Sequence, residues 1–342
     1  MNYFTKDKPY NSLNEYNKKT YNAKVAKIPL NGGFTCPNRD GKKGFGGCSF
    51  CSNLGSGENA GDINDSISKQ FLKIKNVMEN KWKNILYIPY FQAYTNTYAS
   101  LDVLKQKYEE AINVIKDKTI GISIATRADE INDEIAEYLG ELNKKIHVQI
   151  ELGLQTSNEE TGKRINRCLT NAEFISAVNL LRKYNIEIVV HIINGLPGET
   201  KDDMINTIKF INSLDIQGIK FHALLLLKNT KLYEEYFNQN FKILTKEEYV
   251  EITSNQIANL RDDIIIHRLS ADAQLDDLIE PKWTIKKMTV MNDIDKYLRN
   301  NKLYQGIYYK KNRWVFIYFL LWPTFIYYRI SIIKYFIISI FW

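Results

Sequence analysis

Three of the four cysteines in this chain of 342 residues lie in one short stretch near its start. Cys48 and Cys51 are two residues apart, so a single turn can bring both thiolates to one metal centre. Eleven residues separate Cys36 from Cys48, and the glycines among them allow the loop to fold back without steric cost. The spacing therefore predicts a metal site with three thiolate ligands.

The number of ligands narrows what this site can hold. Structural zinc needs four ligands, and no fourth Cys or His lies near the three cysteines in the sequence. A four-iron cluster held by three thiolates leaves one iron open to a non-protein ligand. A disulfide is disfavoured, because no signal-peptide pattern indicates an oxidising compartment. The residues alone favour the cluster, with zinc and unrelated structural cysteines as the alternatives.

Composition sets wider bounds. The length suits one large α/β domain with appendages, or two domains. The net charge of +7 and the 22 tyrosines are compatible with a polyanionic partner such as RNA. The same charge is equally typical of a lysine-rich proteome, because the basic residues are spread rather than clustered. The few cysteines suit a reducing cytosol, so we expect a cytoplasmic protein.

Apolar runs and helical spacing alternate along the chain. Strands are predicted at residues 24–30, 84–91, 119–125, 146–154, 186–193 and 218–226. Helices are predicted at residues 62–82, 100–116, 133–142, 171–184, 200–214, 230–256 and 290–298. The expected N-caps are Asp62 or Asn64 for the first helix, Ser100 for the second and Thr200 for the fifth.

Six strands alternating with helices indicate an α/β fold with parallel pairing and right-handed crossovers. The first strand is not followed by G-x-G-x-x-G, which weakens a dinucleotide-binding interpretation, and an open or closed β/α barrel fits as well. In both folds chemistry gathers at the carboxyl ends of the strands. The cysteine loop, Thr126 with Arg127, Gln155 and the turn at residues 195–199 each follow a strand, so they are predicted to share one rim.

Five segments make the resemblance to a known family specific. They are NGGFTCPNRDG (31–41), YFQAYTNTY (90–98), ELGLQ (151–155), NGLPGE (194–199) and HRLSAD (267–272). With these the chain resembles the radical S-adenosylmethionine superfamily from about residue 10 to about residue 306. The expanded C-x11-C-x2-C spacing is similar to the subgroup of the elongator catalytic subunit, and within it to an uncharacterised bacterial family. The resemblance implies a partial (β/α)6 barrel with an α-rich C-terminal extension.

The resemblance also implies the chemistry. S-adenosylmethionine would chelate the open iron of a [4Fe-4S] cluster, and an electron from a donor such as flavodoxin or ferredoxin would cleave it. The resulting 5′-deoxyadenosyl radical would abstract a hydrogen atom from the substrate. Kinship with the elongator subgroup implies a transfer-RNA wobble uridine as substrate. The alternatives are a radical enzyme acting on a small molecule or protein, and a non-catalytic binding module stabilised by metal.

Several polar residues match positions that contact S-adenosylmethionine in related enzymes. Gln155 and Arg167 match the positions that contact its ribose and carboxylate, although Arg167 could instead be a solvated residue in a basic run. Gln92, with Tyr94 and Asn96, occupies the place of a glycine-rich motif near the methionine amino group.

Further candidates come from the strands. Thr126 and Arg127 end the third strand, and Arg127 is expected to face the cavity. Glu151 shares a strand face with Gln155, which predicts a position inside the barrel with a partner, functional or structural. His191 occupies a ribose-binding position, or is a hydrogen-bonded core histidine.

The remaining candidates are more distant from the cysteine loop. Lys220 and His222 alternate inward on the sixth strand and could face substrate. His267 and Arg268 are assigned to a covering segment. His147 is predicted to be structural, and Cys168 to be a small buried hydrophobe.

Four regions are predicted: an N-terminal segment (1–22), the barrel core (23–228), a covering segment (229–312) and an apolar aromatic tail (313–342). After its first residue, Arg313, the tail is interrupted by Pro323, Arg329 and Lys334, so it lacks the continuous apolar run of a membrane-spanning helix. Three interpretations of the tail remain: a membrane anchor, an appended tail that packs irregularly, or a genuine packed extension.

Overall fold

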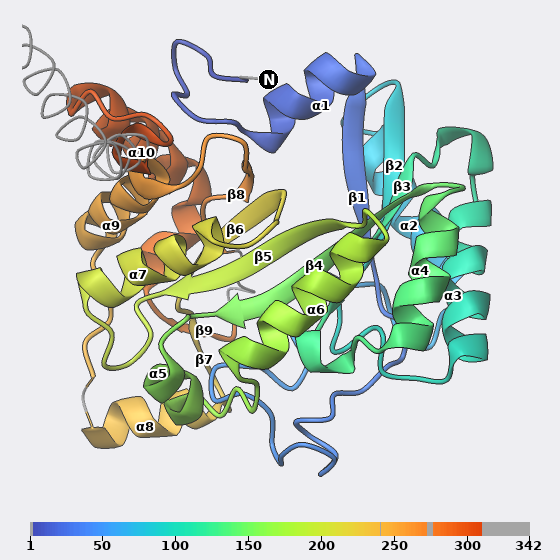
Figure 1. Ribbon diagram of the computed structural model, residues 1–342, viewed down its shortest axis with the longest axis horizontal. Coiled ribbons are helices and arrows are strands. Elements are labelled where there is room, and N and C mark those ends of the chain that lie inside the picture. Colours follow the sequence, from blue (N-terminus) through green and yellow to red (C-terminus); the bar gives the residue numbers. More distant parts are fainter. Residues whose placement is uncertain (1–2, 240, 272–275, 310–342) are drawn as a thin grey trace, which may run out of the picture.

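A seven-stranded parallel sheet forms the framework of the molecule (Figure 1). The computed structural model describes residues 3–239, 241–271 and 276–309. Neighbouring strands follow one another in the order β1-β2-β3-β4-β5-β6-β8. These strands are β1 (Lys24–Leu30), β2 (Ile85–Phe91), β3 (Gly121–Thr126), β4 (His147–Gln155), β5 (Glu187–Asn194), β6 (Gly218–Ala223) and β8 (Ile265–Arg268).

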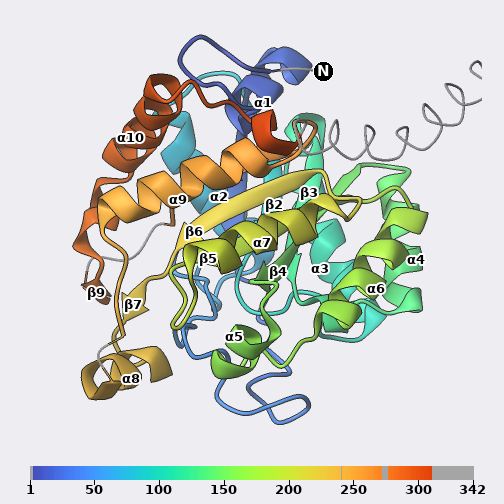
Figure 2. The same ribbon diagram turned by 60° about the vertical axis from the view of Figure 1, so that its left-hand side comes forward.

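Helices between the strands cover the outer face of this sheet, which curls into a partial barrel (Figures 1 and 2). The helices of the described residues are α1 (Leu13–Tyr21), α2 (Ile67–Glu79), α3 (Leu101–Asn113), α4 (Asp133–Asn143), α5 (Glu159–Arg164), α6 (Asn171–Lys183), α7 (Lys201–Asn212), α8 (Lys231–Gln239), α9 (Lys246–Asn259) and α10 (Lys287–Asn300). Parallel strands need such crossovers, because the next strand must start again from the same end of the sheet. The apolar stripes of the helices and the outward residues of the strands form one continuous core.

The α/β class, the partial barrel and its six predicted strands are confirmed, and no strand end differs from its prediction by more than three residues. Thr200 caps α7 as predicted, and its hydroxyl accepts from the backbone N–H of Asp203 in a capping box. Ser66, rather than Asp62 or Asn64, caps α2. Ser100 precedes α3 without a side-chain capping bond.

Two predictions about the C-terminal part are wrong. His267 and Arg268 belong to β8, a seventh strand beside β6, and not to a covering segment. The predicted helix at residues 230–256 is two helices, α8 and α9, because the chain leaves helical geometry after α8 and Thr245 caps a new start. A small antiparallel pair, β7 (Leu226–Leu227) and β9 (Leu278–Glu280), was not predicted.

A second apolar cluster lies at the carboxyl ends of the strands. It is formed by Ile165, Leu196, Leu224, Leu226 and Leu232. Backbone bonds fix the cysteine loop above it, since the N–H of Ser49 donates to Ile165 O at 2.9 Å and that of Leu232 to Ser49 O at 2.9 Å. The loop is therefore held by backbone hydrogen bonds to segments that are distant in the sequence.

The apolar tail at residues 313–342 lies outside the described residues. Among the residues that are described, none of the helices is both long and apolar enough to cross a membrane.

Candidate functional site

A cavity of about 250 Å³ opens at the carboxyl ends of the strands. It is bordered by the cysteine loop, by the ends of β2 to β6 and by β8. Its lining includes ten of the residues selected from the sequence, which are Cys36, Cys48, Cys51, Gln92, Thr126, Arg127, Glu151, Gln155, Arg167 and His191. The rim predicted from the strand pattern is therefore one continuous surface.

Local turns bring the three cysteines to this cavity. The backbone N–H of Cys51 donates to Cys48 O at 3.0 Å, closing the turn of the C-x2-C pair. The long gap before Cys48 folds back on itself, as the N–H of Gly47 donates to Asn38 O at 2.7 Å. Gly47 has φ +80° and lies against the Arg39 side chain, so a residue with a Cβ would be strained there. The glycine-rich loop thus performs the reversal expected of it.

The environment of the thiols fits a cationic iron cluster. Burial raises the pKa of the Cys48 thiol to about 12 and also raises that of Cys51. The guanidinium groups of Arg127 and Arg39 oppose this effect at Cys48 and Cys51 respectively. A bound metal centre would supply the positive charge that buried thiolates need.

The described part of the chain contains no group of three or more His, Cys, Asp or Glu side chains that is arranged to hold a single metal ion. A four-iron cluster does not require such a group, because each thiolate binds its own iron. The three cysteines around one cavity, with two arginines beside them, therefore fit the cluster that the resemblance implies.

Arg127 is fixed in position next to the cysteines. Its Nε and Nη2 donate to both carboxylate oxygens of Asp129, at 2.9 and 2.8 Å. Its Nη1 and Nη2 also donate to the backbone oxygens of Arg167 and Cys168, each at 2.9 Å. Asp129 raises the pKa of this half-buried guanidinium against the effect of burial, so Arg127 provides a permanent positive charge at the cavity.

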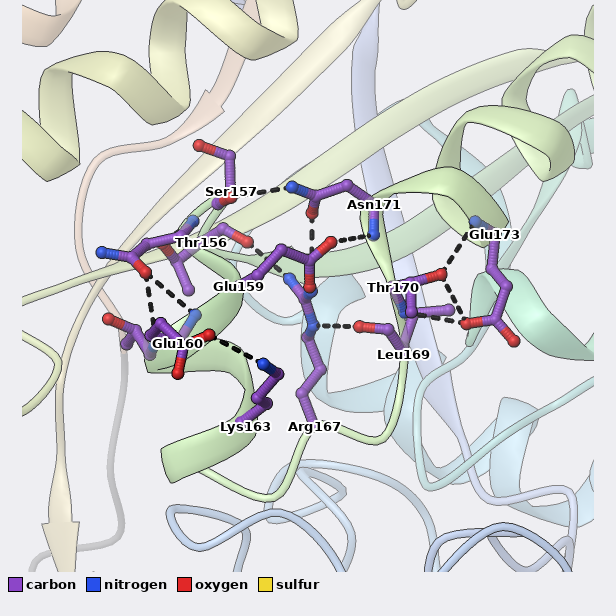
Figure 3. Close-up of polar contacts among 12 residues, drawn as sticks. Thr156, Ser157, Glu159, Glu160, Lys163, Arg167, Leu169, Thr170, Asn171 and Glu173 are labelled. Atoms are coloured by element: carbon purple, nitrogen blue, oxygen red, sulfur yellow. Dashed lines mark hydrogen bonds and ion pairs between the residues drawn. The ribbon is translucent and has the colours of Figure 1, made fainter.

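The Arg167 guanidinium is enclosed by protein acceptors (Figure 3). Nε donates to Leu169 O at 2.7 Å, and Nη1 donates to the backbone oxygens of Leu154 and Thr156 at 3.0 and 2.5 Å. Nη2 donates to Glu159 Oε2 at 3.0 Å and to Asn171 Oδ1 at 3.4 Å. All five N–H groups have partners, so the predicted contact with a cosubstrate carboxylate does not fit. Arg167 instead joins the end of β4 to the starts of α5 and α6.

Replacing Arg167 by lysine should lower the free energy of unfolding by about 2–3 kcal/mol, because lysine has three donors for five acceptors, most of them buried. Denaturant unfolding measures this loss. The matched control is Arg164→Lys, since Arg164 is half-exposed and binds Glu235 at the surface. The control should change stability by less than about 1 kcal/mol. Equal losses in the two variants would contradict the bracing role of Arg167.

The segment after β2 borders the cavity, and its polar side chains are hydrogen-bonded to backbone oxygens of the protein. Gln92 Nε2 donates to Ser56 O at 2.8 Å, and the Tyr94 hydroxyl donates to Asn53 O. Asn96 does not reach the cavity, because its buried amide donates to Phe91 O and Ala125 O. Gln92 and Tyr94 thus connect the end of β2 with the segment that follows the cysteines.

Two further candidates end β3 and β4. The hydroxyl of Thr126 shares a hydrogen bond of 2.6 Å with that of Thr97. Gln155 lies at an irregularity in the β4–β5 register and has φ +66°. A positive φ is costly for a residue other than glycine, and such strain is concentrated at functional sites.

Glu151 is the centre of a polar cluster inside the barrel. Oε1 accepts from Lys27 and from the Ser123 hydroxyl at 3.0 Å. Oε2 accepts from Lys220 and lies 2.7 Å from His191 Nε2. The carboxylate side chain is fully buried, and Lys220 and Lys27 help to hold its pKa well below the usual range although burial acts in the opposite direction. A partner was expected for Glu151 from its position on the strand, but the sequence did not indicate that the partners are lysines.

Three interior histidines stay neutral in the folded protein. Burial is the main cause that lowers the pKa of His191 to about 4, that of His267 to about 3 and that of His222 well below its ordinary value. In the unfolded chain these rings gain protons as the pH falls through about 6.5, whereas in the folded chain they do not. Acid therefore favours the unfolded state in this range.

The melting temperature should accordingly fall between pH 6.5 and pH 5, where each histidine contributes at most about 1.4 kcal/mol per pH unit. His191→Gln should show a smaller fall, because glutamine can still donate to Glu151 and does not titrate. Scanning calorimetry at a series of pH values measures both slopes. Equal slopes in the wild type and the variant would be inconsistent with this role of His191.

Two residues around the cluster, Lys27 and Tyr90, were not predicted as site residues from the sequence. Both lysine ammonium groups lie over the Tyr90 ring, Lys27 at 5.1 Å and Lys220 at 4.8 Å from its centroid. The sequence did contain one indication of Lys27, namely the alternation in β1, where Lys27 lies between the buried residues Ala26 and Ile28. The polar face of that strand points into the barrel rather than to solvent.

Comparison with known proteins identifies the family. The family model described as "Radical SAM superfamily" matches residues 35–211, and "Radical_SAM C-terminal domain" matches residues 216–300. The uncharacterized protein YtqA of Bacillus subtilis is 42% identical over 309 residues, which are 90% of this chain and 95% of that protein. Protein YhcC of Escherichia coli is 33% identical over 83% of this chain and 90% of its own.

A solved structure has the same fold. The Elp3 structure of Methanocaldococcus infernus, an archaeal protein with an N-terminal deletion, has a TM-score of 0.64 and 16% identity. The match covers 83% of this chain and 64% of that chain, so this chain spans slightly less than two thirds of it. Members of the superfamily bind a [4Fe-4S] cluster and S-adenosylmethionine, and the cluster supplies the electron that cleaves the cosubstrate to a 5′-deoxyadenosyl radical. The chain belongs to the radical SAM superfamily and is an enzyme.

Proposed function

We propose that this enzyme modifies transfer RNA, with a wobble uridine as its target. Sequence similarity carries the proposal. A probable threonylcarbamoyladenosine tRNA methylthiotransferase of Methanocaldococcus jannaschii is 34% identical over 107 residues, 30% of this chain. Elongator complex protein 3 of Dictyostelium discoideum is 24% identical over 169 residues, 48% of this chain. The net charge of +7 is compatible with a polyanionic substrate.

The proposal assigns roles to the residues of the cavity. Cys36, Cys48 and Cys51 hold the cluster, while Gln92 and Gln155 border the cosubstrate. The same space is lined by Thr126, Arg127, Glu151 and His191. Arg167 acts only through the loop whose backbone it holds in place.

The proposal also includes the setting of the reaction. An electron donor such as flavodoxin or ferredoxin reduces the cluster. A reducing cytoplasm suits four cysteines that form no disulfide with one another. We propose a division of the chain at residues 22, 228 and 312, in which the third region also supplies β8 to the barrel sheet.

Mass spectrometry of transfer-RNA nucleosides from a deletion strain tests the substrate. We expect one modified nucleoside to be lost, to return with the wild-type gene, and to stay absent with a Cys51→Ala gene. Unchanged nucleosides, together with purified enzyme that carries no small RNA at low salt, would exclude the RNA proposal.

A small molecule is the second candidate substrate. Biotin synthase of Methanococcus aeolicus is 25% identical over 162 residues, 46% of this chain. The polar cluster around Glu151 also places charged groups deep in the cavity, where a compact substrate could reach them. Unchanged RNA nucleosides with altered small metabolites in the deletion strain would favour this candidate.

A further inference from the structure

Asn38 lies two residues after Cys36, inside the loop that carries the three cysteines. Its side chain is fully buried. The amide nitrogen Nδ2 of Asn38 lies 3.5 Å from Cys48 Sγ and 2.6 Å from the backbone oxygen of Asn166. The two amide hydrogens are therefore directed to one cysteine sulfur and to one backbone carbonyl.

Asn166 determines which end of the Asn38 amide faces the sulfur. The carbonyl oxygen of Asn166 can only accept, so the amide must present Nδ2 and not Oδ1 to it. The reversed amide would place two acceptors against each other at hydrogen-bond distance. Nδ2 carries two hydrogens, and the second one is directed to Cys48 Sγ. The donor at this sulfur therefore follows from the fold around it.

The other end of the Asn38 amide shows what this orientation costs. Oδ1 is shielded from solvent and has no hydrogen-bond partner among the described residues. A Cβ at position 44 would overlap this oxygen, so Gly44 allows the loop to close directly over it. A buried acceptor without a partner is unfavourable, and its presence calls for a compensating contact elsewhere. The bond from Nδ2 to Cys48 is such a contact, because a thiolate is a stronger acceptor than a thiol.

The surrounding backbone holds Asn38 in place. Asn38 O accepts from the N–H of Gly47 at 2.7 Å, and Pro37 O accepts from that of Gly44 at 3.2 Å. The side chain of Asn166 donates to Gly47 O at 2.8 Å, so the same residue fixes both the loop and the amide. A donor that is fixed in this way does not have to reorganise when the charge on the sulfur changes.

We propose that Asn38 is a positioning residue for the reductive step, because its amide donates to the sulfur of Cys48 and raises the reduction potential of the iron–sulfur cluster. One electron passes from a donor such as flavodoxin or ferredoxin, which is oxidised, to the cluster, which is reduced, and Asn38 keeps both amide hydrogens. Reduction makes the thiolate sulfurs more negative, so a hydrogen bond to one of them is stronger in the reduced state. The inference rests on one part of the proposed function, namely that Cys48 binds the cluster.

A redox titration of the reconstituted full chain, followed by electron paramagnetic resonance, tests the proposal in the absence of S-adenosylmethionine and RNA. Asn38→Ala removes the donor, so its midpoint potential should be more negative than that of the wild type. We expect a change of about tenfold in the ratio of reduced to oxidised cluster, which is about 59 mV for a one-electron couple. Asn38→Asp has nearly the same shape and provides a second variant in case Asn38→Ala assembles no cluster. Its midpoint should shift in the same direction, since a carboxylate oxygen replaces the N–H donor.

Asn166→Gly is the matched control. Glycine tolerates the left-handed backbone of this position, where φ is +52°, and retains the carbonyl oxygen that orients Asn38. The substitution removes the side-chain bond to Gly47 O. We expect a less stable loop in this variant, with the ratio of reduced to oxidised cluster within about twofold of the wild type.

Three results would overturn the proposal. They are an unchanged or more positive midpoint in Asn38→Ala (in Asn38→Asp, if only that variant holds a cluster), an equal shift in Asn166→Gly, and loss of the cluster from both Asn38 variants. The last result would make Asn38 a structural residue of the loop. Failure of the proposed function has different signatures: a cluster retained by Cys48→Ala would refute the ligand, and unchanged nucleosides in the deletion strain would count against the RNA substrate.

Discussion

Replacing Cys36, Cys48 or Cys51 by alanine is expected to abolish both the visible absorbance of the reconstituted cluster and the cleavage of S-adenosylmethionine. In the proposed ligand set each thiolate would bind a separate iron, and the described residues around the cavity offer no spare cysteine to replace it. The loss should be complete rather than graded, because the cosubstrate binds at the iron that the three thiolates leave open. Iron content, absorbance and release of 5′-deoxyadenosine under reductant measure it.

Cys168→Ala is the matched control, and it should retain both properties. Cys168 lies outside the residues that line the cavity, and its Sγ donates to Asn166 Oδ1 at 3.3 Å. Iron at the native stoichiometry in Cys36→Ala would refute the assignment of the ligands. Loss of the cluster in Cys168→Ala would show instead that the loop, and not the ligand set, limits assembly.

The barrel strands could be predicted because burial on both faces makes them short apolar runs, and the helices because their caps and spacing are regular. β8 was missed because its four residues, Ile265–Arg268, include a histidine and an arginine. Those polar side chains belong to the interior of the barrel, where the polar cluster accommodates them. An apolar pattern cannot indicate a strand whose inner face is polar.

The site was predictable to the level of shared position, because parallel strands end on one rim. The hydrogen-bond partners of each side chain could not be predicted. Asn166 and Cys168 have φ +52° and +49°, and Arg167 lies between them with its guanidinium among backbone carbonyls. The basic neighbours of Arg167 in the sequence suggested that its side chain is solvated or binds a ligand. The left-handed backbone of Asn166 and Cys168 instead turns the chain so that this side chain is buried.

Replacing Glu151 by glutamine is expected to lower the free energy of unfolding by about 3–5 kcal/mol, the range found when one partner of a buried ion pair is removed. The change keeps the shape of the side chain but leaves Lys220 and Lys27 without their carboxylate. Lys220 is 5% exposed, so water cannot replace the lost partner. Denaturant unfolding at pH 7 measures the effect.

A second variant separates charge from packing. Glu151→Gln combined with Lys220→Met should be more stable than Glu151→Gln alone, because it removes one unpaired buried cation and keeps the stem of the side chain. The surface control Glu141→Gln, which breaks an exposed pair with Lys144, should change stability by less than about 0.5 kcal/mol. If the double variant is instead the least stable, Lys220 contributes through contacts other than its pair with Glu151. The carboxylate would then not be the group that holds the interior of the barrel together.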